Sequence, residues 1–190
     1  CRYLLRYWPK KHYLGEMIMV IFDVDQTLID STIRESLCRL SCGSLDLSEY
    51  RRIKHELIKS DSVLPLGIAF KELKERSSFK WRIVTARHID NMDRLTLSVL
   101  LGLDYHDFVN SRVICRNNAG DFGGDGNEQD SGKYKKPIID RLAYFSPSRL
   151  HVIDDCPSVL SLSGHFQTVS AYDFYHSTVS ECKSRLLSFV

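Results

Sequence analysis

A short apolar run that ends in two aspartates constrains the fold of this chain more than any other feature. Residues 17–22 are all apolar and rich in β-forming side chains, and Asp23 and Asp25 follow at once. The run is too short to cross a membrane and is typical of a strand buried on both faces of a parallel sheet. On one extended strand the two carboxylates would crowd a single face, whereas a chain that turns after Asp23 lets them diverge around a common site. They are either caps of the next helix or a nucleophile and proton-transfer pair beside a cation.

Strand-like and helical segments alternate along the chain, and this order predicts an α/β fold with a doubly wound, mainly parallel sheet. The further strands are expected at 81–87, 109–115, 150–155 and 166–170. Helices are expected over 137–145 and 177–187, with a polar, glycine-containing loop over 117–133 before them. Another helix ends near Gly102, and its apolar stripe is Met92, Leu95, Val99 and Leu100.

Three apolar stripes at helical spacing lie between the first acidic motif and the second strand. Their members are Ile33, Leu37 and Leu40; Tyr50, Ile53 and Leu57; and Leu66, Ala69, Phe70 and Leu73. They predict a small helical cap insert over 30–79, too short to be an independent domain. The catalytic core is then expected over 16–29 and 80–190, after a lead-in over 1–15.

Composition narrows the class of protein. A hydrophobic content of 43% suits a packed core, and a net charge of +2 is too small to indicate nucleic-acid binding by composition alone. No stretch reaches the apolar length of a transmembrane helix. Six scattered cysteines without a CxxC pair predict reduced thiols, and hence a cytoplasmic or other reducing compartment. Because the chain begins with Cys1, we expect it to be incomplete, processed or cut from something longer.

Polar residues follow three of the predicted strands. The clusters are Asp23, Asp25 and Thr27; Thr85 and Arg87; and Asp154 and Asp155. The carboxyl ends of parallel strands meet at one edge of a sheet, where ligand sites of α/β proteins form. Helix capping explains any one cluster, but three together indicate a common site.

These clusters, in this order, resemble the four motifs of the haloacid dehalogenase-like (HAD) superfamily. The chain has Asp23-x-Asp25-x-Thr27, then Val84-Thr85 at a strand end, a lysine before a helix at Lys136, and Asp154-Asp155. The resemblance covers roughly residues 17–170 and implies a Rossmann-like HAD core. Gln26 departs from the pattern, because many members carry glycine there.

The resemblance implies a phosphatase that acts through an aspartyl-phosphate. Asp23 would attack phosphorus, and Asp25 would protonate the leaving oxygen and then activate water. Mg²⁺ would be held by Asp23, the backbone carbonyl of Asp25 and Asp154, with Asp155 supporting the metal or orienting the lysine. The residues expected to touch the substrate are Thr27, Thr85, Ala86, Arg87 and Lys136, of which Thr85 and Lys136 are also expected to be catalytic.

Two of these assignments have close competitors. Lys136 is favoured because it directly precedes Pro137 and an apolar helix, but Lys133 and Lys135 stand beside it. Arg87 is expected to reach a phosphate as a forked donor. Its alternative is a pair with Asp90 or Asp93.

The substrate is less constrained than the chemistry. The Thr85-x-Arg87 ending and the segment 152–159 resemble the phosphatase domain of phage-type polynucleotide kinase–phosphatases, which favours a nucleotide or polynucleotide phosphate end. The basic groups that could follow a nucleic-acid backbone are Arg112, Arg116, Lys133 and Lys135, and Trp81 or Tyr172 could stack a base. The alternatives are a small phosphorylated metabolite under the cap, a dehalogenase, and a catalytically silent binding domain. The acid cluster argues against the dehalogenase. No membrane partner is predicted, and the sequence does not indicate whether there are protein partners.

Overall fold

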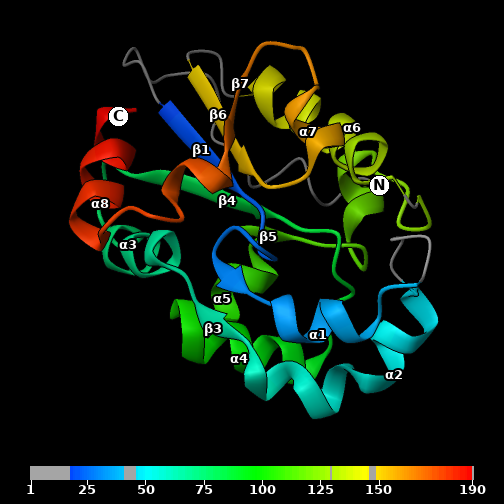
Figure 1. Ribbon diagram of the computed structural model, residues 1–190. Helices are drawn as coiled ribbons and strands as arrows, with labels where there is room; N and C mark the ends of the chain where they lie inside the picture. The colour runs from blue at the N-terminus through cyan, green and yellow to red at the C-terminus, as the bar shows by residue number, and fades with distance from the viewer. Residues whose placement is uncertain (1–17, 41–45, 129, 146–148, 190) are drawn as a thin grey trace.

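The computed structural model describes residues 18–40, 46–128, 130–145 and 149–189, and the predicted lead-in over 1–15 lies outside them (Figure 1). Five strands form one sheet in which every pair is parallel, in the order β5–β4–β1–β6–β7. Their bounds are β1 (Ile18–Phe22), β4 (Lys80–Val84), β5 (Val113–Ile114), β6 (Arg149–Asp154) and β7 (Gln167–Ser170). The prediction of an α/β fold with a parallel sheet is confirmed.

The first apolar run forms the central strand, and all five of its residues are buried. Alternate side chains of a strand point to opposite faces, so β1 contributes to two separate cores. Val20 and Phe22 pack in one core, and Met19 and Ile21 pack in the other. A strand with apolar residues on both faces and a partner on both edges belongs at the centre of such a sheet.

Helices cover both faces (Figure 1). The core with Phe22 also contains residues of α3 (Pro65–Leu73), α4 (Asn91–Leu101) and α8 (Val179–Ser188), and α3 lies against α8. The other core contains residues of α6 (Ser131–Phe145) and α7 (Pro157–Leu160), which lie against each other. The short helix α5 (Tyr105–Val109) precedes β5.

Local signals fix the ends of two helices, and the end of one of them near Gly102 is as the sequence predicts. The helix α4 begins at a capping box in which Asp90 and Asp93 each accept from the other's backbone N–H, and it ends at Gly102 in the left-handed region, with φ of 66°. The helix α8 begins at a second capping box, built from Thr178 and Glu181.

The segment after the first motif is partly different from the predicted insert. The two-residue strands β2 (Ile29–Asp30) and β3 (Ser62–Val63) pair antiparallel, and α1 (Thr32–Leu37), α2 (Leu47–Leu57) and the 3₁₀ turn η2 (Ile58–Ser60) lie between them. The predicted insert also includes α3, but this helix packs in the core that contains Phe22. There Phe70 contacts Phe22 and Trp81 at ring-centroid distances of 5.2 and 5.0 Å. A capping role of the α1–α2 segment stays a prediction.

Two predicted apolar stripes are wrong. Ile33 and Leu37 on α1 are 56% and 60% exposed, and the face that α1 buries carries Arg34 instead. On α4, Met92, Leu95 and Val99 of the predicted stripe are exposed and Leu100 is partly buried, while Leu97 and Leu101 are the buried apolar residues.

Three other boundaries differ from the predictions. The strand expected from Val109 to Cys115 is confined to β5, because α5 continues to Val109 and a turn over 110–112 precedes the strand. The helix expected to begin at Pro137 begins at Ser131 and continues past the proline. The loop expected over 117–133 contains the 3₁₀ turn η3 (Ala119–Phe122). In the described part of the chain, no helix has the length and apolar character that a membrane span needs.

Candidate active site

The three polar clusters meet at the carboxyl edge of the sheet. The strand β1 lies between β4 and β6, and its last residue, Phe22, is in register with both Ile83 and Ile153. The backbone N–H of Asp23 then donates to the Ile153 carbonyl at 3.0 Å. Asp23 and Asp154 therefore leave neighbouring strands at the same level.

Asp23, Asp154 and Asp155 form one group with Lys135, called here the lysine cluster. One oxygen of each carboxylate lies within 4.8 Å of the others. The Lys135 Nζ lies 2.9 Å from Asp23 Oδ1 and 2.7 Å from Asp154 Oδ2. Asp23, Asp154 and Lys135 are all buried. Three acids thus surround a single ammonium group.

The charge imbalance of the lysine cluster appears in its proton affinities. Burial raises the pKa of Asp23 well above its usual value, against the opposing effect of Lys135 and with help from the neighbouring carboxylates. Burial, then the charge of Asp154, raises the pKa of Asp155 to about 7. The pKa of Lys135 is raised as well, because the attraction of Asp154 and Asp23 outweighs its burial. The lysine cluster therefore has more negative charge than its one ammonium group can balance.

The donor set of the lysine cluster fits a hard divalent cation. All three acids offer oxygen ligands, the type that Mg²⁺ prefers, and a bound cation would favour their ionised forms. The side chains of Asp23, Asp154 and Asp155 come together as predicted. The side chain of Asp25 lies outside this group, so only its backbone carbonyl is left for the predicted metal role.

The structure places Lys135, and not Lys136, among the carboxylates. Lys135 lies on the buried face of α6 with Ile138, Ile139 and Leu142, at helical spacing. The Nζ of Lys136 is at the surface, 2.8 Å from Asp140 Oδ2. The expected placement of Lys136 is wrong. The helix α6 begins at Ser131, before Pro137, and this earlier start places Lys136 on the side of the helix that faces away from the sheet.

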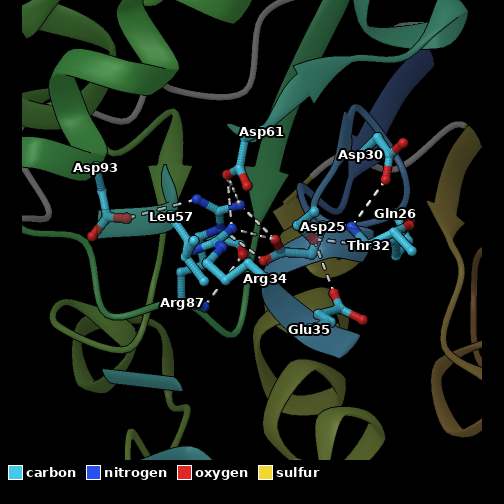
Figure 2. Close-up of polar contacts among 12 residues, drawn as sticks. Asp25, Gln26, Asp30, Thr32, Arg34, Glu35, Leu57, Asp61, Arg87 and Asp93 are labelled. Atoms are coloured by element: carbon cyan, nitrogen blue, oxygen red, sulfur yellow. Dashed lines mark hydrogen bonds and ion pairs between the residues drawn. The ribbon is translucent and has the colours of Figure 1, made fainter. Parts of the chain in front are cut away.

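Asp25 belongs to a second group, called here the arginine cluster, with Asp61, Arg34 and Arg87 (Figure 2). Arg87 forms two hydrogen bonds to Asp25. Its Nε donates to Oδ2 at 2.7 Å, and its Nη2 donates to Oδ1 at 2.5 Å. Arg34 Nη2 donates to the same Oδ1 at 3.2 Å and to Asp61 Oδ2 at 2.8 Å. Arg87 Nη2 also donates to that Asp61 oxygen, at 3.2 Å.

The arginine cluster joins four separate segments. Arg34 comes from α1, Asp61 from the residue before β3, Asp25 from the loop after β1 and Arg87 from the loop after β4. The side chains of Arg34 and Asp61 are fully buried, and that of Asp25 is 23% exposed. Burial alone would raise the pKa of Asp25, but the Arg87 and Arg34 guanidiniums lower it to about 2. Asp25 is therefore an ionised carboxylate in this arrangement.

Arg87 faces carboxylates in this structure. Besides Asp25 and Asp61, its Nη1 lies 3.6 Å from Asp93 Oδ1, which is one of the two pairings weighed against a phosphate role. Its predicted contact with a phosphate stays a prediction, and it would require this network to rearrange.

The remaining predicted residues lie at the same edge. Thr85 is buried, and its hydroxyl accepts the Arg87 N–H at 3.3 Å, while its carbonyl accepts the Tyr134 hydroxyl at 3.1 Å. The Ala86 carbonyl accepts from Arg116 Nε at 2.6 Å. The buried Thr27 hydroxyl has no hydrogen-bond partner.

Gln26 has a positive φ of 52°, a conformation that glycine adopts without cost. The glycine that many members of the resembled superfamily carry here would adopt this conformation without strain. Here local bonds hold the glutamine: Nε2 donates to Ser31 Oγ at 3.3 Å, and Oε1 accepts from Thr32 Oγ1 at 3.3 Å. The Tyr175 hydroxyl donates to the Gln26 carbonyl.

Comparison with known proteins gives three results. The family described as "Bacteriophage T5 5'-deoxynucleotidase" matches residues 10–176. The 5'-deoxynucleotidase of Escherichia phage T5 is 35% identical over 100 residues, which make up 52% of this chain and only 41% of that protein. The crystal structure of a hydrolase from Pseudomonas syringae aligns over 82% of this chain and 94% of the hydrolase chain, at 16% identity and a TM-score of 0.45.

Proposed function

This chain belongs to the bacteriophage T5 5'-deoxynucleotidase family, and from that membership we propose that it is a Mg²⁺-dependent phosphatase of deoxynucleoside 5'-monophosphates. The observation that carries the proposal is the lysine cluster, in which Asp23 lies beside Asp154, Asp155 and Lys135 at the carboxyl edge of the sheet. Family membership supports the substrate class, and the cluster supports the chemistry.

The side chains of Asp23, Asp154 and Asp155 would hold Mg²⁺, together with the backbone carbonyl of Asp25. The ion would supply the positive charge that the three acids lack and would offset the repulsion between Asp23 and a phosphate dianion. Lys135 adds one ammonium group that can contact both Asp23 and a phosphate oxygen.

Asp23 acts as the nucleophile. Its carboxylate oxygen forms a bond to phosphorus as the bond to the sugar 5'-oxygen breaks, which leaves an aspartyl-phosphate and a deoxynucleoside. Water then cleaves the acyl-phosphate and releases inorganic phosphate. The Thr85 hydroxyl and the Lys135 ammonium stabilise the charge on the transferred phosphoryl group.

Asp25 is the general acid of the first step and the general base of the second. As an ionised carboxylate held by Arg87, it suits the second step, in which it removes a proton from the attacking water. In the first step it must give a proton to the leaving oxygen, so it must first take one up from solvent, which requires Arg87 to turn away from it. A substrate phosphate is a competing acceptor for that guanidinium, so this step also accounts for the phosphate contact expected of Arg87.

A polynucleotide end is the less favoured substrate, because three of the four basic groups expected to follow its backbone are engaged elsewhere. Arg116 donates to the carbonyls of Ala86, Gly126 and Glu128, and Lys135 lies inside the lysine cluster. Arg112 pairs with Asp107 and lies over the Trp81 ring. A mononucleotide needs no such track.

A phosphate-release assay with matched substrates tests the proposal. We expect deoxynucleoside 5'-monophosphates to be hydrolysed faster than 5'- or 3'-phosphorylated oligonucleotides and sugar phosphates, with activity lost in EDTA and restored by Mg²⁺. A preference for oligonucleotide ends, with KM rising steeply as salt is added, would favour the polynucleotide alternative. Preference for a sugar phosphate would favour the small-metabolite alternative, and no release from any substrate would contradict the proposed function.

A further inference from the structure

An exposed aromatic ring lies beside the lysine cluster. The strand β7 pairs with β6 so that Ser170 is in register with Asp154. The 3₁₀ turn η4 (Ala171–Phe174) follows at once and carries Tyr172 just past the carboxyl end of β7. The neighbouring strand β6 ends at Asp154, and Asp155 follows it in the chain. Neighbouring strands lie about 4.8 Å apart, so Tyr172 starts from a position one strand away from these acids. Its residue is 55% exposed.

A second tyrosine packs against this ring. The Tyr175 and Tyr172 rings are 4.9 Å apart between centroids, at an interplanar angle of 59°. The Tyr175 hydroxyl donates to the Gln26 carbonyl, within the loop that also carries Asp25. One end of the pair is therefore anchored to the catalytic loop, while Tyr172 keeps much of its surface open.

The pair faces acids of both the core and the insert. Burial raises the pKa of Tyr172, and the charges of Asp155 and of Glu35 on α1 raise it further. Burial likewise raises the pKa of Tyr175, and the same two carboxylates add to it. Asp155 of the lysine cluster and Glu35 of α1 are therefore both near enough to the two rings to act on them.

The other candidate rings are less suitable. Trp81 is buried, packs edge-on against Phe70 and donates its Nε1 to the Lys74 carbonyl. Among the described residues, Tyr105 and Tyr144 are the other exposed tyrosines. They belong to α5 and α6, which lead into the amino ends of β5 and β6, whereas Tyr172 follows the carboxyl end of a strand.

We propose that Tyr172, supported by Tyr175, is the platform on which the nucleobase of the substrate stacks. This inference rests on the proposed function and adds a base-binding subsite to it. Stacking on an aromatic face is tolerant of base identity, so the platform would select nucleotides over phosphates that lack a base without discriminating strongly among the bases.

Binding to the Asp23→Asn protein tests the platform without turnover. Deoxyadenosine 5'-monophosphate and 2-deoxyribose 5-phosphate are titrated in the presence of Mg²⁺, with Tyr172→Ala, Tyr172→Phe or Tyr144→Ala added to that background. We expect Tyr172→Ala to weaken nucleotide binding about tenfold relative to the sugar phosphate. Tyr172→Phe keeps the ring and should preserve the ratio within about twofold, as should the surface control Tyr144→Ala.

The outcomes separate this inference from the proposed function. An unchanged ratio in Tyr172→Ala, or equal losses for both ligands, would overturn the platform. A wild-type protein that releases no phosphate, in combination with a Tyr172-dependent preference for nucleotide binding, would overturn the phosphatase proposal and leave the platform standing.

Discussion

Two clusters of buried charge flank the loop after β1, and they balance their acids in opposite ways. In the lysine cluster three carboxylates share one ammonium group, whereas in the arginine cluster Asp25 and Asp61 face two guanidiniums. Asp23 and Asp25 are two residues apart, yet the pKa of the first is raised and that of the second is lowered to about 2. The surplus of acid marks the place where a cation and an anionic substrate can be bound. The balanced cluster holds the insert to the core.

The largest expected effect is on the lysine cluster. Asp23→Asn keeps the shape of the side chain but removes the nucleophile, so we expect phosphate release to fall by about four orders of magnitude or more. Circular dichroism and thermal unfolding should show an intact fold, because the change also relieves carboxylate repulsion. Substantial residual turnover in a folded variant would contradict the proposed mechanism.

In the arginine cluster the main loss should be in stability. Asp61→Asn leaves buried Arg34 and Arg87 with one carboxylate fewer, and we expect the free energy of unfolding to fall by about 3 kcal/mol. Urea denaturation measures the change. Asp173→Asn is the matched control, because its pair with Arg185 at 3.1 Å is exposed and should contribute less than about 1 kcal/mol. Equal effects of the two variants would show that the buried network is not what holds the insert.

The two neighbouring lysines offer a direct test of the placement on α6. Lys135→Met removes the ammonium group beside Asp23 and should lower kcat about 100-fold. Lys136→Met removes a surface pair with Asp140 and should change kcat less than about twofold. The reverse order would restore Lys136 as the site lysine.

The metal-free protein should lose stability as pH rises. An unfolded aspartate has a pKa of about 3.9, and in the folded protein the pKa of Asp155 is raised to about 7, so folding favours the protonated form. That contribution is fully present below about pH 4 and is lost as pH rises through about 7. In EDTA we expect the Tm to fall by a few degrees between pH 5 and pH 8.

Mg²⁺ should raise the Tm more at pH 8 than at pH 5, since ions and protons compete for the same oxygens. Asp155→Asn should reduce the pH-dependent fall seen in EDTA. A Tm that rises with pH in EDTA would contradict the charge imbalance of the lysine cluster.

The sheet and its acidic edge were predictable because they depend on local patterns. Apolar runs mark β1 and β6, and the acids that end them must meet once the strands are parallel. The site lysine was obscured by Pro137. A proline favours a helix start, but α6 tolerates it in the interior, and the stripe of Lys135, Ile138, Ile139 and Leu142 that crosses it indicates the buried face.

The arginine cluster could not be predicted by the same means. Arg34 and Asp61 are 27 residues apart, and a long-range pair of charges leaves no periodic pattern in a sequence. The exposed apolar residues Ile33 and Leu37 moreover suggest the opposite orientation of α1, because periodicity assigns the core face to apolar residues. The buried ion pairs override that preference.

The place of β1 at the centre of the sheet has a consequence for folding during synthesis. Its partner on one side is β6, so Asp23 cannot meet Asp154 until the ribosome has made nearly the whole sheet. Pairing between strands so distant in sequence is slow, and until it occurs the apolar edge of β1 is open to other chains. Assembly of the proposed metal site is therefore a late event, and its appearance would report that β1 and β6 have paired.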